Sequence, residues 1–185
     1  MDDHRKHLAS VDSVLAIVLE KVSLTPLIPR SNYFESLTCQ IINQQLSEKA
    51  ADTITDRFIK LFETQKFPKP QEVLQVSDER LRSSGISYSK VSYIKNVARA
   101  FEEDASFFQS LEDVTDSEVI MHLTKIKGVG KWTAEMFLMF SLGREDIFSS
   151  GDQGLKNAID HLYKFKKKKT PEQLEKFATR WAPYR

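Results

Sequence analysis

Cysteine is nearly absent from this sequence, which has one among 185 residues. A single thiol cannot form an internal disulfide, and it cannot supply the four thiolates that hold an iron–sulfur cluster. Cys39 lies in the apolar run SLTCQII and has no histidine close to it in the sequence. We therefore expect Cys39 to be a small residue of the core rather than a nucleophile.

Long hydrophobic runs are also missing. No stretch approaches the roughly 18 apolar residues of a membrane-spanning helix, and the first ten residues, MDDHRKHLAS, are polar. No apolar segment of a secretory signal peptide follows them. These absences argue against contact with a membrane and predict an intracellular location.

An excess of charge of one sign is missing from the whole chain, which carries a net charge of +1. Charge is nevertheless distributed unevenly. Between residues 119 and 169, ten Lys and Arg stand against five Asp and Glu, so this segment carries +5 and the remainder −4. The pattern permits a local phosphate-binding surface. A solvated basic face explains it equally well.

Glycine is rare outside one region of the chain. Five of the six glycines fall within 27 residues, at positions 128, 130, 143, 151 and 154. Glycine is needed where the backbone takes a positive φ or approaches another group closely. The region from 128 to 154 is therefore expected to have unusual backbone geometry.

Helical periodicity dominates the rest, and no two-residue alternation is long enough for a sheet, so we expect an all-α protein. Capping boxes at Thr115–Glu118 and Thr170–Gln173 mark two helix starts. The expected helices cover residues 11–21, 31–45, 47–63, 78–84, 89–103, 116–126, 131–142, 152–163 and 171–181.

Residues 123–137, LTKIKGVGKWTAEMF, are typical of two helices joined by a glycine turn. The second helix begins directly after Gly130, where its first amides lack partners and its dipole is positive. Without side chains at Gly128 and Gly130 these amides can approach a phosphate, and Lys127 and Lys131 add positive charge. A glycine turn alone is a weak signal, so the prediction of a nucleic-acid backbone contact needs the whole pattern.

The turn and its flanks resemble the helix-hairpin-helix motif of the helix-hairpin-helix/GPD superfamily of DNA glycosylases. Three further segments match the alkyladenine glycosylase II (AlkA-like) branch of that superfamily: QQLSEKAA from residue 44, GISYSKVSYI from residue 85 and WAPYR from residue 181. Together the four ordered motifs span roughly residues 32 to 185.

The resemblance implies a two-lobed helical bundle with the active site in the cleft between the lobes. One lobe would span about residues 32–130, and the other would combine about residues 1–31 with residues 131–185. All 185 residues would then form a single glycosylase domain.

The resemblance also implies a catalytic carboxylate. Asp152 lies 22 residues after Gly130, as does the catalytic aspartate that follows the hairpin in the family. An inert interpretation stays open, because an aspartate in front of a helix is a common N-cap. Glu145 and Asp146 are alternatives nearby, but neither is flanked by glycines.

Further roles follow from the same resemblance. Gln45, or else Leu46, would enter the duplex as a wedge when the damaged nucleotide rotates out; a glutamine pair that caps a helix is the other interpretation. Gln44, Trp132 and Met136 would line the substrate pocket, although the last two fit a helical core as well. Trp132 stands where strand-cleaving relatives carry a lysine, so no lyase activity is expected.

The chemistry of this family needs no cofactor. The resemblance does imply a monovalent cation, Na⁺ or K⁺, held at the hairpin by backbone carbonyls. By position these carbonyls belong to Thr124, Ile126 and Val129.

The sequence thus predicts a monomeric, monofunctional base excision repair enzyme that removes 3-methyladenine and 7-methylguanine from duplex DNA. A non-enzymatic helix-hairpin-helix DNA-binding module is one alternative, and a glycosylase for uracil or mismatched thymine is another. Relatives continue past the position of Arg185 into a helix that adds an aromatic pocket wall. We expect this chain to lack that wall.

Overall fold

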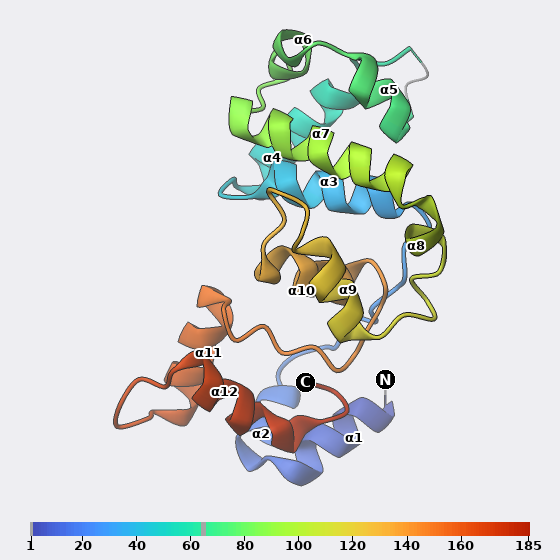
Figure 1. Ribbon diagram of the computed structural model, residues 1–185. Coiled ribbons are helices and arrows are strands. Elements are labelled where there is room, and N and C mark those ends of the chain that lie inside the picture. Colours follow the sequence, from blue (N-terminus) through green and yellow to red (C-terminus); the bar gives the residue numbers. More distant parts are fainter. Residues whose placement is uncertain (1, 64–65) are drawn as a thin grey trace. The chain divides into compact units, whose positions relative to one another are not determined.

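The fold is described by a computed structural model for residues 2–63 and 66–185. Within these residues every regular element is a helix and none is a strand, as the periodicity predicts. None of the helices in this described part has the length and apolar character needed to span a bilayer. The chain divides into two compact units, Met1–Pro29 with Leu138–Arg185 (unit 1) and Arg30–Phe137 (unit 2), both drawn in Figure 1.

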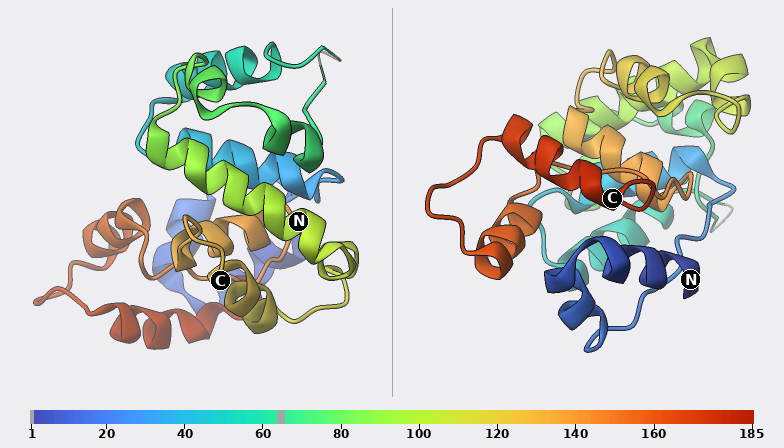
Figure 2. Two further views of the ribbon diagram at one scale, coloured as in Figure 1. Left: turned by 45° about the horizontal axis from the view of Figure 1, so that its top comes forward. Right: turned by 90° about the horizontal axis from the view of Figure 1, so that it is seen from below.

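Unit 2 is organised around its longest helix, α7 (Tyr88–Glu103), which packs against α3 (Tyr33–Asn43), α5 (Pro70–Gln75) and α6 (Asp78–Arg82). Figures 1 and 2 show α7 lying along α3. The unit also holds α4 (Glu48–Ile59), α8 (Ala105–Gln109), α9 (Asp116–Leu123) and the start of α10 (Lys131–Phe140). Its core consists of fully buried aliphatic and aromatic side chains, among them Leu37, Ile41, Phe58, Ile94, Leu123 and Phe137.

Unit 1 joins segments that lie on both sides of unit 2 in the sequence. Its elements are α1 (Asp2–Val11), α2 (Ser13–Leu19), the end of α10, α11 (Gln153–Tyr163), α12 (Pro171–Ala178) and a 3₁₀ turn (Thr179–Trp181). A small core of Ile159, Leu174, Ala178 and Trp181 receives Leu8 and Leu15 from the first two helices. Burial of large apolar side chains therefore ties the first helices to the last ones.

The helix expected over residues 11–21 is present in shorter form as α2, but α1 was not expected. The two helices are separated at Asp12, where φ is −150° and ψ is 108°. The Asp12 carboxylate accepts hydrogen bonds from the amides of Val14 (3.0 Å) and Leu15 (3.2 Å) and so caps α2. The polar sequence of α1 gave too weak an apolar pattern to reveal that helix.

Two short helices, α5 and α8, were not expected, and α10 ends at Phe140 rather than at residue 142. Both predicted capping boxes are confirmed, at Thr115 with Glu118 and at Thr170 with Gln173. The division between the units falls between Phe137 and Leu138, inside α10, whereas the sequence places it at the start of that helix.

Cys39 is half-buried in α3 rather than fully enclosed. Burial raises the pKa of its thiol to about 11, and the nearby Glu35 carboxylate acts in the same direction. The thiol therefore stays protonated at neutral pH, which fits a packing role and not a nucleophilic one.

Candidate active site

The predicted hairpin is present as the turn between α9 and α10 in unit 2. Gly128 has φ +109°, and a Cβ atom there would lie 2.2 Å from Cγ of Tyr93. The turn is also fixed by Asn96, whose Nδ2 donates to the carbonyl of Lys127 at 2.9 Å. Gly128 is thus required by packing within the unit, in addition to any contact with a ligand.

Gly130, unlike Gly128, is surrounded by open space. A Cβ atom at this position would meet no atom within 4 Å, and the residue is exposed directly before the first turn of α10. The helix N-terminus is therefore open to an external group, and its amides can serve an anion. Of the two hairpin glycines, Gly130 is the one that leaves room for a ligand.

The two hairpin lysines lie in different electrostatic surroundings. Lys127 and Lys131 are both exposed. Lys131 Nζ lies 3.4 Å from Oε1 of Glu135, one turn further along α10, and the Glu135 side chain is buried. Part of the positive charge of Lys131 is therefore balanced within the helix, and Lys127 is the stronger source of positive potential at the turn.

The three carbonyls predicted to hold a cation lie in one short stretch of backbone. Thr124 forms the C-cap of α9, and the carbonyl of Ile126 accepts from the amide of Val129 at 2.9 Å. A carbonyl oxygen has two lone pairs, so this bond leaves Ile126 able to accept another group. The donors are neutral oxygens, which suit a hard monovalent cation.

The predicted wedge lies in the turn after α3. Gln45 is exposed and has a left-handed backbone with φ 60°, and Leu46 is 38% exposed. Gln44 is half-buried, and its Nε2 donates to Oγ1 of Thr133 on α10 at 3.3 Å. Gln45 therefore protrudes from a tight turn, while Gln44 ties that turn to the helix that follows the hairpin.

Trp132 and Met136 share one side of α10, four residues apart. Trp132 is 41% exposed and Met136 is half-buried, whereas Thr133, Ala134 and Phe137 of the same helix are buried. A tryptophan with this exposure is not a core residue of unit 2. This exposure argues against the core interpretation for Trp132, and the pocket role of both residues stays a prediction.

Asp152 is the N-cap of α11 in unit 1, so the structural role weighed from the sequence is present. Its Oδ1 accepts from the amide of Leu155 at 2.7 Å, and its own amide donates to the carbonyl of Ser149 at 3.0 Å. The side chain is half-buried. An N-cap carboxylate stands at the positive end of a helix dipole, which favours its charged form without preventing a catalytic role.

The turn before Asp152 is fixed by a hydrogen bond to α12. Ser149 and Ser150 are buried, and the Ser150 hydroxyl donates to Oε1 of Glu175 at 2.7 Å. This contact fixes the backbone two residues before Asp152, and nothing in the sequence pattern indicated it.

The two alternative carboxylates are engaged elsewhere in unit 1. Asp146 accepts a two-pronged hydrogen bond from Arg185, at 2.7 Å from Nε and 3.0 Å from Nη2, and this partner lowers the pKa of the Asp146 carboxyl. Glu145 lies 3.3 Å from Nε2 of His4. Both therefore have a structural partner within unit 1.

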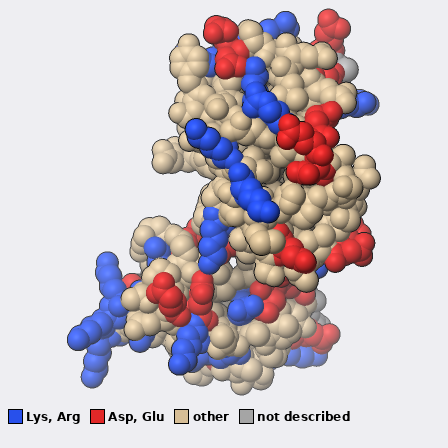
Figure 3. Space-filling model, in the orientation of Figure 1, with Lys and Arg blue, Asp and Glu red and all other residues tan. Residues whose placement is uncertain are grey.

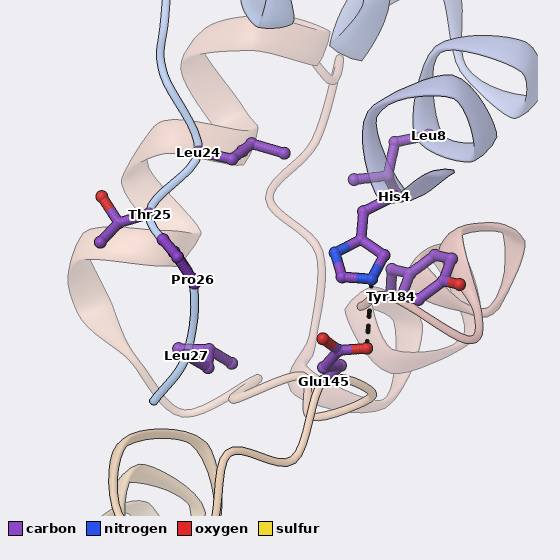
Figure 4. Close-up of a pocket in the computed structure, with 8 residues that line it drawn as sticks. All are labelled: His4, Leu8, Leu24, Thr25, Pro26, Leu27, Glu145 and Tyr184. Atoms are coloured by element: carbon purple, nitrogen blue, oxygen red, sulfur yellow. Dashed lines mark ion pairs between the residues drawn. The ribbon is translucent and has the colours of Figure 1, made fainter. Parts of the chain in front are cut away.

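The His4–Glu145 pair borders a cavity of about 300 Å³ in unit 1, drawn in Figure 4. The Tyr184 ring lies 4.2 Å from the His4 ring, and an apolar wall faces them from the extended segment that contains Leu24 and Leu27. None of the predicted site residues lines this cavity.

One polar cluster of unit 1 was missed from the sequence. Asp12 is 6% exposed, and its carboxylate accepts hydrogen bonds from the Tyr163 hydroxyl (2.8 Å) and from Nε1 of Trp181 (2.9 Å), besides the two amides of α2. Its partners are 151 and 169 residues away in the sequence, so local patterns carry no trace of the contact.

Positive charge on unit 1 is concentrated in the loop between α11 and α12. Lys164 and the run Lys166–Lys169 are exposed there, and Figure 3 shows Lys and Arg side chains gathered at this loop. Lysines with this exposure are typical of a solvated loop.

Comparison with known proteins identifies the family of the chain. The chain matches the HhH-GPD superfamily base excision DNA repair protein family over residues 38–183. It is 32% identical over 184 residues to an alkylbase DNA glycosidase-like protein of Schizosaccharomyces pombe, a match that covers 97% of this chain and 86% of that protein. Other curated relatives are longer, and the chain spans about two thirds of their length.

Solved structures show the same likeness. A 3-methyladenine DNA glycosylase of Schizosaccharomyces pombe in complex with abasic DNA has a TM-score of 0.85 and 29% identity, covering 98% of this chain and 90% of that one. A DNA-3-methyladenine glycosidase of Bacillus halodurans has a TM-score of 0.84 and 40% identity, covering 98% and 83%. The chain therefore belongs to the HhH-GPD superfamily of base excision DNA repair proteins.

Proposed function

We propose that this protein is a monofunctional DNA glycosylase that releases alkylated purines, such as 3-methyladenine and 7-methylguanine, from duplex DNA. The likeness to proteins named as 3-methyladenine glycosylases over nearly the whole chain carries this proposal. Asp152, a half-buried carboxylate at a helix N-cap after the hairpin helix, supplies the chemical group it needs.

Alkylation at N3 or N7 gives the purine a positive charge, which weakens the bond between the base and C1′ of the sugar. When that bond breaks, its electron pair goes to the base, which leaves as a neutral molecule, and positive charge develops on the sugar. The ionised Asp152 stabilises this charge and accepts a proton from the water whose oxygen bonds to C1′. The leaving group needs no general acid.

The flipped base needs a surface that recognises a flat cation. Trp132 offers an aromatic face with 41% of its surface exposed, and Met136 adds a polarisable contact on the same side of α10. Gln44, anchored to Thr133, offers an amide for the edge of the base. A neutral uracil or thymine can stack on the aromatic face but lacks the additional cation–π attraction, which favours alkylated purines as substrates.

The hairpin would bind one phosphate of the DNA backbone through the amides after Gly130, with Lys127 nearby. The carbonyls of Thr124, Ile126 and Val129 would hold a monovalent cation, whose charge would favour the same phosphate. Such contacts position the duplex and do not read its sequence.

Two glycine variants separate binding from folding. Gly130→Ala is expected to weaken binding of undamaged duplex by about tenfold, the loss of roughly one charge-assisted hydrogen bond, with an unchanged melting temperature. Gly128→Ala is expected to lower the stability by about 1–3 kcal/mol, because its Cβ would overlap Tyr93. Fluorescence anisotropy and thermal unfolding measure the two effects. If Gly130→Ala and Gly128→Ala weaken DNA binding equally and neither changes the melting temperature, the different roles assigned to the two glycines are contradicted.

Abasic DNA should not become covalently attached to the protein. A lyase needs an amine that attacks C1′, and Trp132 occupies the position of that lysine. We expect no adduct with abasic duplex after borohydride treatment, and strand breakage only after alkali. A trapped adduct that disappears in Lys131→Met would instead identify the neighbouring lysine as a nucleophile.

Single-turnover release of 7-methylguanine from duplex DNA tests the proposed function, with uracil and mismatched thymine duplexes as parallel substrates. Release from the first alone is the expected result. Binding without release from any of them would favour the non-enzymatic DNA-binding module. The elution volume of the protein at several concentrations tests the proposed monomer.

A further inference from the structure

The turn that follows α3 has an unusual backbone and an unusual anchor. Gln44 leaves the helix with φ −51° and ψ 126°, and Gln45 adopts φ 60°. A left-handed conformation is unfavourable for a residue with a side chain. Such a turn persists only when its surroundings hold it in place.

Lys90 on α7 provides the contacts that hold this turn. Its Nζ donates to the carbonyl of Ile42 at 2.8 Å and to the carbonyl of Gln44 at 2.7 Å. The two acceptors flank Asn43, the last residue of α3, so one ammonium group fixes the backbone on both sides of the helix end. A cation at this place also complements the negative end of the helix dipole.

The contact between Lys90 and the turn is partly buried within unit 2. Lys90 is half-buried, and burial lowers the pKa of its ammonium group. The ammonium is thus drawn partly out of water, a cost that the two carbonyls offset. Leu46 contributes a further bond, from its amide to the carbonyl of Asn43 at 3.1 Å.

We propose that Lys90 is a positioning residue for nucleotide flipping, which acts by holding the 44–46 turn so that Gln45 meets the duplex from a fixed backbone. The proposal rests on the proposed glycosylase function. Lys90 itself touches neither the base nor the sugar. A turn that is already ordered can insert its side chain without first losing conformational freedom, so the flipped state becomes more populated.

Lys90→Met removes the donors and keeps much of the side-chain volume. We expect single-turnover release of 7-methylguanine to slow by about 10–100-fold, the scale of a small misplacement at an active site. Binding of undamaged duplex should stay at the wild-type value, and the melting temperature should fall by no more than about 4 °C, because the two carbonyls are part-buried and can regain water. Lys90→Arg, which can still donate to two carbonyls, should recover most of the rate. Lys95→Met, a change on the same helix at a lysine that pairs with Asp78, is the matched control.

Two readouts distinguish positioning from general stability. The fluorescence of 2-aminopurine beside the lesion should report less unstacking in Lys90→Met than in wild type. In the Gln45→Ala background, Lys90→Met should add little further loss of rate, because both act through the same side chain. Multiplicative losses would overturn the proposal, as would a Lys90→Met protein that loses stability and undamaged-duplex binding together.

The two proposals fail in different ways. If wild type releases the base and Lys90→Met releases it at the same rate, only the positioning role is disproved. If wild type releases no base, the glycosylase function is disproved, and the positioning role with it.

Discussion

The Asp152→Asn substitution is expected to lower the single-turnover rate of 7-methylguanine release by about 10²–10⁴-fold. Asparagine keeps a side-chain oxygen for the amide of Leu155, which lies 2.7 Å from Oδ1 of Asp152, and it is as good an N-cap as aspartate. The melting temperature should therefore change little. What is lost is the negative charge that stabilises the sugar cation and the base that accepts a proton from water.

A matched control is available six residues earlier. Asp146→Asn removes one negative charge from the same unit, but that carboxylate is already bound by Arg185 and should not matter for chemistry. Base release by Asp146→Asn should match wild type. If Asp152→Asn releases base at the wild-type rate, Asp152 is a helix cap and the catalytic carboxylate lies elsewhere.

The largest effect on stability is expected at Asp12. Asp12→Ala leaves the Tyr163 hydroxyl, the Trp181 indole and two amides of α2 without their acceptor. A buried donor without a partner costs about 1–3 kcal/mol. Only the Trp181 bond is fully buried, and the other three donors are part-buried and can regain water, so we expect a total loss of about 2–5 kcal/mol. Urea unfolding followed by tryptophan fluorescence measures it. Ser77→Ala, which removes only an exposed N-cap bond to Arg80, should cost about 1 kcal/mol.

The Asp12 cluster also predicts a dependence of stability on pH. Burial acts to raise the pKa of Asp12, but hydrogen bonds from Trp181, Tyr163 and the two α2 amides outweigh it, and the pKa is lowered. A carboxyl whose pKa is lower in the folded state stabilises the fold above its unfolded pKa, and this contribution disappears as the pH falls through the folded value. The stability difference between wild type and Asp12→Ala should thus shrink below about pH 4. A stability difference between the two proteins that stays constant down to about pH 2 would contradict this pH dependence.

The sequence predicted the parts of the structure that depend on local interactions. The all-α class follows from periodicity, and the capping boxes at Thr115 and Thr170 place two helix starts correctly because their hydrogen bonds span three residues. The hairpin turn is likewise local. Its glycines nevertheless differ in a way that sequence cannot show, since the need for Gly128 comes from the ring of Tyr93 on another helix.

Longer-range contacts escaped prediction for the same reason. Asp12 was included in an expected helix, because its partners Tyr163 and Trp181 lie far along the chain. Lys90 was noted only as part of a matching segment, and its bonds to Ile42 and Gln44 became evident only in three dimensions. Asp152 could be assigned either as a cap or as a catalyst, because both roles favour the same residue type in front of a helix.

The division of the chain has a consequence for its synthesis. Unit 2 is one uninterrupted stretch, Arg30–Phe137, whereas unit 1 needs Asp12 to meet Tyr163 and Trp181. On the ribosome, unit 2 can therefore complete its core while the first 29 residues still lack the later segment of unit 1. The core of unit 1, which supports the segment that carries Asp152, can form only after Trp181 has emerged from the ribosome. A nascent chain thus has its proposed DNA-binding hairpin before its proposed catalytic carboxylate is in place, so translation that stops before Trp181 should yield a folded unit 2 without catalytic activity.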